Sequence, residues 1–112
     1  MARLTSAMLV SALVRRVNRE GGSAMILAKG DQTAGAILLL AYDRGANPRF
    51  LERGIGPEGS PALVPSGPAR LADEGEVTAY WQRRRSRDSD LWVVELDIAS
   101  AERFAAETMG IG

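Results

Sequence analysis

Two long apolar segments dominate the pattern of hydrophobic and polar positions along the chain. One runs from Gly35 to Tyr42, and the other, from Leu91 to Leu96, has acidic residues beside it at both ends. Neither shows the strict polar alternation of a strand with one wet face. Continuous apolar runs of this length are typical of strands covered on both faces. The pattern therefore predicts one sheet in which the segments 37–41 and 91–96 lie side by side in the middle.

The flanking segments show the spacing of amphipathic helices. Apolar residues at 10, 13, 14 and 17 form one stripe, after a capping residue at Thr5 or Ser6. A second helix is predicted within 73–87, because acids open it and arginines close it, as the helix dipole favours. A third helix is predicted from Ile98 to Met109.

Shorter segments complete the predicted sheet. Residues 24–28 and 49–52 have the composition of strands, and the polar connection 29–35 predicts a β-hairpin that leads into the segment 36–42. Residues 54–68 contain four glycines and four prolines, so we predict a long, mobile loop without regular structure.

The expected fold class is α+β. We predict a single domain over residues 1–112, with elements in the order α-β-β-β-α-β-α. Its sheet is expected to be four-stranded and mostly antiparallel, with the helices packed on it.

Composition excludes much chemistry. The chain has no cysteine and no histidine, which removes catalytic triads, thiolate nucleophiles and the usual zinc sites. We expect no metal and no cofactor, and we lean against an enzyme. Net charge is zero, so no overall field attracts nucleic acid or a membrane surface.

The apolar start of the chain imitates an export signal only superficially. Polar residues interrupt it, and Arg15-Arg16 follows without a small-residue cleavage site. No segment has the roughly 20 apolar residues that a membrane span needs. A cytoplasmic location is therefore expected, and the absence of cysteine fits it.

Two candidate binding sites contain residue types that bind phosphate. Gly30 and Asp31, with Gly35, resemble a phosphate-cradling loop, but a hairpin turn needs the same residues and is the favoured interpretation. Four arginines, beside two aromatic residues, form the best candidate for nucleic-acid binding. They are Arg83, Arg84, Arg85 and Arg87. Salt bridges to Asp88, Asp90 or acids on neighbouring strands are the favoured alternative for this cluster.

Glu95 is a carboxylate inside an apolar run. Either the acid is buried beside an arginine, or, as we favour, the strand emerges into solvent there. The element order also matches restriction-endonuclease-like nucleases, and Asp43 and Glu52 are candidate metal ligands. However, the sole lysine, Lys29, lies on the first strand, and Arg53 occupies the position expected for the catalytic lysine. A nuclease is therefore not favoured.

Three segments resemble a family of small bacterial proteins, mostly from alphaproteobacteria, known as domain-of-unknown-function family 1491. They are Leu13-Val14-Arg15-Arg16, the segment 29–38 (KGDQTAGAIL) and the segment 87–95 (RDSDLWVVE). Family members usually have arginine at position 29 and proline at position 89. The resemblance supports the fold and implies no catalytic residues, because the family has no established activity.

The sequence thus favours a non-enzymatic module that acts through contact with a protein partner. A second copy is one candidate partner, because two interior strands expose four faces and only three modest helices are predicted to cover them. The alternative is nucleic-acid binding through the arginines at 83–87.

Overall fold

The computed structural model describes residues 4–111, which form one five-stranded sheet and three helices. In chain order the elements are α1 (Ser6–Arg19), β1 (Ser23–Ala28), β2 (Ile37–Asp43), β3 (Ala46–Ile55), β4 (Pro61–Ser66), α2 (Glu74–Arg87), β5 (Trp92–Asp97) and α3 (Ala101–Met109). The α+β class and the three helices are as predicted, and the described part of the chain contains one strand more than expected.

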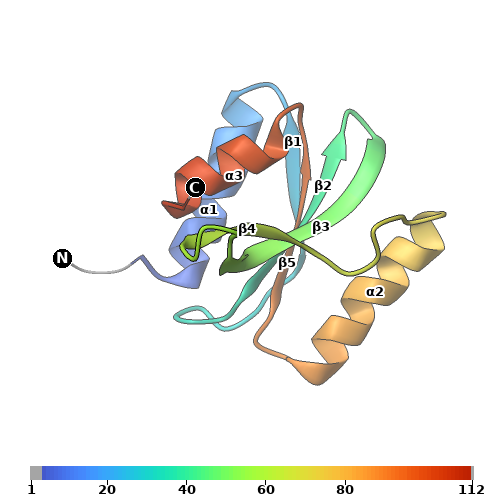
Figure 1. Cartoon of the computed structure of the whole chain (residues 1–112). Helices are drawn as coiled ribbons and strands as arrows, with labels where there is room; N and C mark the ends of the chain where they lie inside the picture. Colours follow the sequence, from blue (N-terminus) through green and yellow to red (C-terminus); the bar gives the residue numbers. More distant parts are fainter. Residues whose placement is uncertain (1–3, 112) are drawn as a thin grey trace.

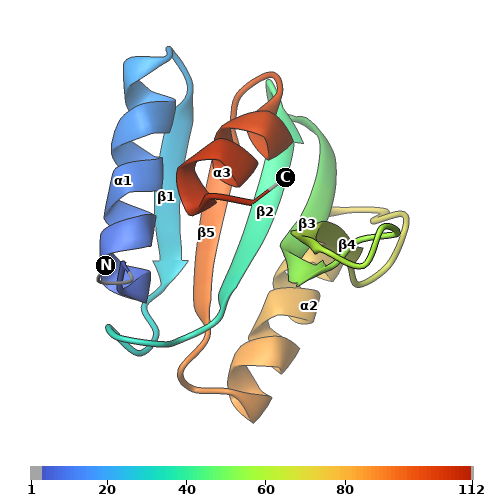
Figure 2. The same ribbon diagram turned by 60° about the vertical axis from the view of Figure 1, so that its left-hand side comes forward.

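The two apolar runs lie next to each other in the middle of the sheet, as predicted. The strand order is β1-β5-β2-β3-β4, which Figure 2 shows from the face covered by α1 and α3. β2 and β5 are parallel, and every other neighbouring pair in this sheet is antiparallel. β2 is buried along its length except at Asp43.

Helices cover both faces of the sheet. α1 and α3 lie on one face and α2 on the other (Figure 1). Alternate residues of β2 therefore enter two separate cores: Leu39 packs with residues of α1 and α3, and Leu38 with Val77 of α2. The three helices thus bury the interior strands within one chain, and self-association is not needed for that purpose.

The segment 54–68 differs from the prediction, because it contains β4. Leu51 of β3 pairs with Pro65, and Ile55 pairs with Pro61. Proline cannot donate a hydrogen bond to a sheet, so it is tolerated only where its nitrogen points away from the neighbouring strand. The two prolines lie four residues apart on an edge strand, so both nitrogens point to the same, outer side, which explains how a proline-rich segment forms regular structure.

The predicted hairpin between β1 and β2 is wrong. β5 lies between these strands and pairs with both of them. The segment 29–36 is therefore a crossover that passes the end of β5. The physical reason is that β5 is the most apolar strand after β2 and gains most from a central position.

The helix ends follow the sequence signals except at the start of α3, and α3 ends at Met109 as predicted. The Thr5 hydroxyl accepts a hydrogen bond from the N–H of Met8 (3.2 Å), and Asp73 accepts one from Glu76 (2.9 Å). α3 begins at Ala101 instead of Ile98, because Ser100 adopts a left-handed conformation and Ile98 packs in the core. Among the helices of residues 4–111, none combines the length and apolarity needed to cross a membrane.

Candidate functional site

The glycine-rich loop after β1, residues 29–36, connects the first turn of α1 with the start of β5 through hydrogen bonds, and we call it a structural joint. The Asp31 carboxylate accepts hydrogen bonds from the N–H groups of Thr33 (3.2 Å) and Ala34 (2.9 Å), which closes the turn. The loop carbonyls of Gln32 and Thr33 accept the first N–H groups of α1, from Ala7 (2.9 Å) and Ser6 (3.1 Å). These helix donors, which an anion would need, are therefore occupied by the protein itself.

The same loop contacts the start of β5. The carbonyl of Asp90 accepts the N–H of Asp31 (3.0 Å), and the Trp92 indole donates to the carbonyl of Asp31 (2.8 Å). A Cβ atom at Gly30 or Gly35 would overlap the Asp90 carbonyl oxygen, so only glycine fits at both positions. The structure thus brings Gly30, Asp31 and Asp90 together, through backbone contacts.

The arginine cluster of α2 is divided between two roles. Arg84 forms a bidentate ion pair with Glu52 (2.6 and 3.0 Å) and donates to Ser66 and Tyr80, both at 3.1 Å. This hydrogen bonding lowers the pKa of Glu52 and raises the pKa of Arg84. The other candidate metal acid, Asp43, bonds Arg49 (3.1 Å), so neither acid is free for a metal.

The Arg85 side chain is also held by hydrogen bonds within the protein. It donates to the backbone carbonyls of Leu91 (3.0 Å) and Ser89, which fixes the turn between α2 and β5. Arg83 and Arg87 are exposed on the outer side of the helix. The four arginines therefore do not converge on one surface. Within residues 4–111, no cluster of three or more acidic side chains is suited to a metal ion.

The segments that join at this loop are also those that resemble the 1491 family. The chain matches the family described as "Protein of unknown function (DUF1491)" over residues 4–106. The chain belongs to this family. Gly30 and Gly35 belong to the segment 29–38, and Asp90 and Trp92 belong to the segment 87–95, so this joint connects two of the segments that carry the resemblance.

Solved structures of the DUF1491 family have the same fold. A crystal structure of a family protein from Caulobacter crescentus is 32% identical, with a TM-score of 0.75, and the match covers 91% of this chain and 94% of that one. The NMR structure of a DUF1491 protein from the same organism is 31% identical, with a TM-score of 0.73 and coverage of 93% and 94%.

A third similar structure is protein Atu0922 from A. tumefaciens, at 31% identity and a TM-score of 0.69, with coverage of 88% and 89%. No curated protein matches the sequence. These comparisons establish the family and its fold, and they provide no activity.

The outer edge of β1 is apolar and exposed. β1 has the sequence SAMILA, without charge or proline, and has β5 on one side only. Met25 is 58% exposed and Ile26 is 38% exposed. Leu4, just before α1, and Met8, within α1, are also exposed. The pairing of β1 with β5 is regular from Ser23 to Ile26 and shifts register between Ile26 and Ala28. An unpaired apolar edge of this kind is a template for another strand.

A groove of about 390 Å³ lies between α1 and β1. Its apolar lining comes from Ala7, Val10, Val14, Ile26 and Trp92. Two cations, Arg15 and Lys29, also line it, together with Ser11, Gly30 and Gln32. None of these described lining residues is acidic, so the groove is apolar and positively charged.

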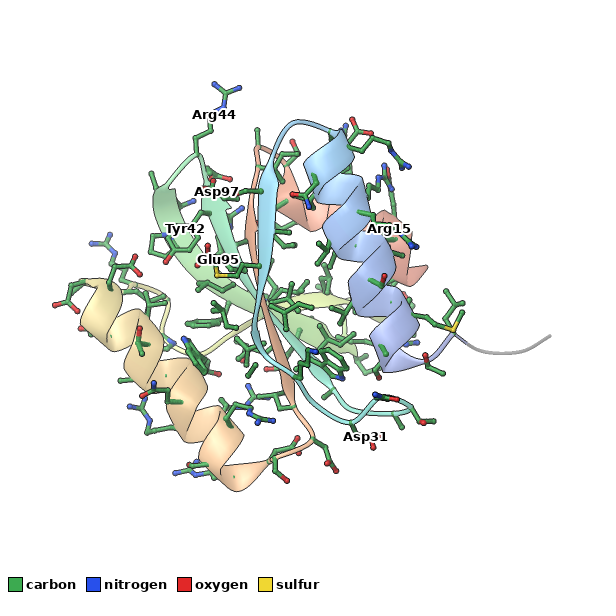
Figure 3. The ribbon with its side chains drawn as sticks, turned by 180° about the vertical axis from the view of Figure 1, so that it is seen from behind. Arg15, Asp31, Tyr42, Arg44, Glu95 and Asp97 are labelled. Carbon is green, nitrogen blue, oxygen red and sulfur yellow. The ribbon has the colours of Figure 1, made fainter. Side chains whose placement is uncertain are left out.

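The opposite side of β1 is acidic. Figure 3 looks towards β1, with Glu95, Asp97 and Tyr42 on one side of it and Arg15 on the other. Glu95 pairs across the sheet with Met25 and is half-buried. Burial, and then the charges of Glu74 and Asp97, raise the pKa of Glu95. No hydrogen bond or ion pair joins the Glu95 carboxylate to another residue within 4–111. Neither interpretation from sequence described this site fully.

The open edge of β1 was not predicted, because the sequence pattern placed β2 beside β1. The predicted hairpin would have covered one side of β1 with β2 and left its other side unassigned. The signal that was present is compositional: β1 has neither the charge nor the proline that protects exposed edges, whereas 61–66 has two prolines. Arg15 and Lys29 were noted separately, and only the fold places them in one groove.

Proposed function

We propose that this protein is a small protein-binding module that pairs β1 with an extended strand of a partner. The observation that carries the proposal is the open, apolar edge of β1. Strand addition is a common mode of peptide recognition, in which backbone hydrogen bonds give affinity and flanking side chains give specificity.

The backbone directions along β1 define the binding positions. The N–H of Trp92 donates to the carbonyl of Ala36 (2.8 Å), and that of Ile98 donates to the carbonyl of Tyr42 (3.2 Å). The backbone N–H and C=O groups of even-numbered residues in β5 therefore point towards β2. The backbone groups of odd-numbered residues in β5 consequently point towards β1. Glu95 pairs with Met25, so the N–H and C=O groups of Ala24 and Ile26 point outwards. These groups are positioned to bond an added strand.

Nucleic-acid binding through the arginines has less support. Arg84 and Arg85 are held by Glu52 and by backbone carbonyls, and only Arg83 and Arg87 are exposed. Two exposed arginines, one helical turn apart on a chain of zero net charge, provide little of the phosphate neutralisation that drives such binding.

Substitution Ala24→Pro tests the proposal. Proline removes an outward donor without removing a bond to β5. Libraries of random peptides displayed on phage are selected on the wild type, on Ala24→Pro and on Ala69→Pro, a control in an exposed loop. Sedimentation of the three proteins measures self-association, and circular dichroism verifies that each is folded.

We expect the wild type and Ala69→Pro to enrich peptides or to self-associate, and Ala24→Pro to do neither. Retention of the same binding by Ala24→Pro would contradict the proposal. A wild type that enriches no peptide and sediments as a monomer at millimolar concentration would contradict it as well.

A further inference from the structure

We infer that the strand recognised by β1 carries carboxylate side chains that enter the groove between α1 and β1. This inference rests on the proposed strand addition and assigns the chemistry of the partner. It commits to an acidic, extended segment of another protein as the occupant of the groove.

The groove lies where the side chains of an added strand would extend. Ile26, whose backbone points outwards, has its side chain in the groove, on the α1 side of the sheet. A strand added at the usual spacing of about 4.8 Å would place alternate side chains next to that of Ile26. Every second side chain of the partner therefore enters the groove, and the others lie on the side of Met25.

The charge of the groove selects carboxylates. Arg15 and Lys29 are exposed cations, and they form no salt bridge within residues 4–111. The lining between them is apolar, with Val14, Ile26 and Trp92. An apolar side chain with a carboxylate two residues before and after it would match both the lining and the two cations.

The same charges disfavour a second copy. Strands that pair across a twofold axis bring the same surface of each subunit together. Arg15 and Lys29 would then face a second groove with the same two cations and no acidic lining residue. Pairing of two copies would bring the four cations close together, whereas an acidic partner neutralises the two cations of one groove.

The probe is a blocked heptapeptide, Thr-Glu-Thr-Ile-Thr-Glu-Thr, which presents two glutamates and an isoleucine on one side of a strand. Its control has lysine in place of both glutamates. Calorimetry measures binding to the wild type, to Ala24→Pro, and to the double variant Arg15→Glu/Lys29→Glu. A matched double variant, Arg83→Glu/Arg87→Glu, makes the same change in net charge on the exposed side of α2.

We expect the acidic peptide to bind the wild type at least tenfold more tightly than the lysine peptide. Arg15→Glu/Lys29→Glu should weaken binding of the acidic peptide about tenfold, as two solvent-exposed ion pairs allow, and Arg83→Glu/Arg87→Glu should not. Ala24→Pro should abolish binding of both peptides.

Other results separate the inference from the proposed function. Binding that Ala24→Pro abolishes but that is insensitive to both charge changes supports strand addition and overturns the acidic partner. A micromolar wild-type dimer that Ala24→Pro dissociates makes a second copy the occupant, which also overturns the inference alone. Failure of the acidic peptide to bind at low salt overturns it too. Undiminished peptide binding by Ala24→Pro contradicts strand addition itself.

Discussion

The two edges of the sheet are built in opposite ways. On the β4 edge, Pro61 and Pro65 remove outward donors, and beside it Arg84 joins Glu52, Ser66 and Tyr80 in one network. The β1 edge has neither prolines nor charges. Arg15 and Lys29 lie on one side of it and Glu95 on the other, and none of the three forms a salt bridge among residues 4–111. One edge is closed to further strands and the other is open.

This contrast separates stability from binding. A half-buried charge that is paired and hydrogen-bonded stabilises the fold, and its removal leaves the partner unsatisfied. A charge without a protein partner contributes little to the fold and is available to a ligand. We therefore expect loss of the paired charges near β4 to lower stability, and loss of the unpaired cations near β1 to weaken binding.

The largest expected effect is at Arg84. Arg84→Ala leaves the Glu52 carboxylate half-buried without its cation, and should lower the free energy of unfolding by about 2 kcal/mol. Urea denaturation at pH 7 measures this loss. The exposed Arg83→Ala on the same helix is the control, with an expected change within about 0.5 kcal/mol. Equal effects of the two substitutions would show that the network near β4 does not stabilise the fold.

A smaller effect is expected from opening the β4 edge. Pro65→Val restores an outward N–H on an exposed edge strand, and each new strand-to-strand hydrogen bond contributes about 1 kcal/mol. The variant should self-associate at concentrations at which the wild type does not. Sedimentation velocity over a concentration series measures this. Unchanged sedimentation would show that proline does not close this edge.

The smallest effect is expected at Glu95. Its pKa is raised in the folded protein, so the folded state holds the proton more tightly than the unfolded state does. This stabilising contribution is complete below the ordinary glutamate pKa, near 4.5, and is lost as the pH rises through the raised folded value.

Glu95→Gln should therefore stabilise the protein at pH 7, by no more than about 1 kcal/mol, and should have little effect near pH 4. Thermal unfolding of the variant and the wild type across this range measures the difference. The acids at Glu52 and Glu102 have lowered pKa values and act in the opposite direction, so the variant must be compared with the wild type at each pH. Destabilisation at pH 7 would contradict the assignment of Glu95 as an unpaired acid.

The centre of the fold was predictable because its signals are local. The apolar runs that become β2 and β5 and the caps at Thr5 and Asp73 depend on neighbouring residues in the chain. The edges were not predictable in the same way. Whether β5 lies between β1 and β2 depends on long-range pairing, and a proline-rich segment becomes a strand only where it lies at an edge.

The candidate site was even less accessible from the sequence. Gly30 and Asp31 were predicted to lie in a turn, and Asp90 was a candidate partner of the arginines. Their shared role as a joint depends on a backbone contact between segments about 60 residues apart in the chain. Arg15 and Lys29 come together only because α1 lies along β1. The roles of single residues thus became visible after the strand order was known.

The most direct test of the open edge is amide hydrogen exchange of the wild type, measured by NMR with and without the heptapeptide that carries two glutamates. We predict slower exchange at Ala24 and Ile26, whose N–H groups point outwards, and little change at Met25, which pairs with β5. Binding of the peptide with unchanged exchange at Ala24 and Ile26 would contradict strand addition at β1.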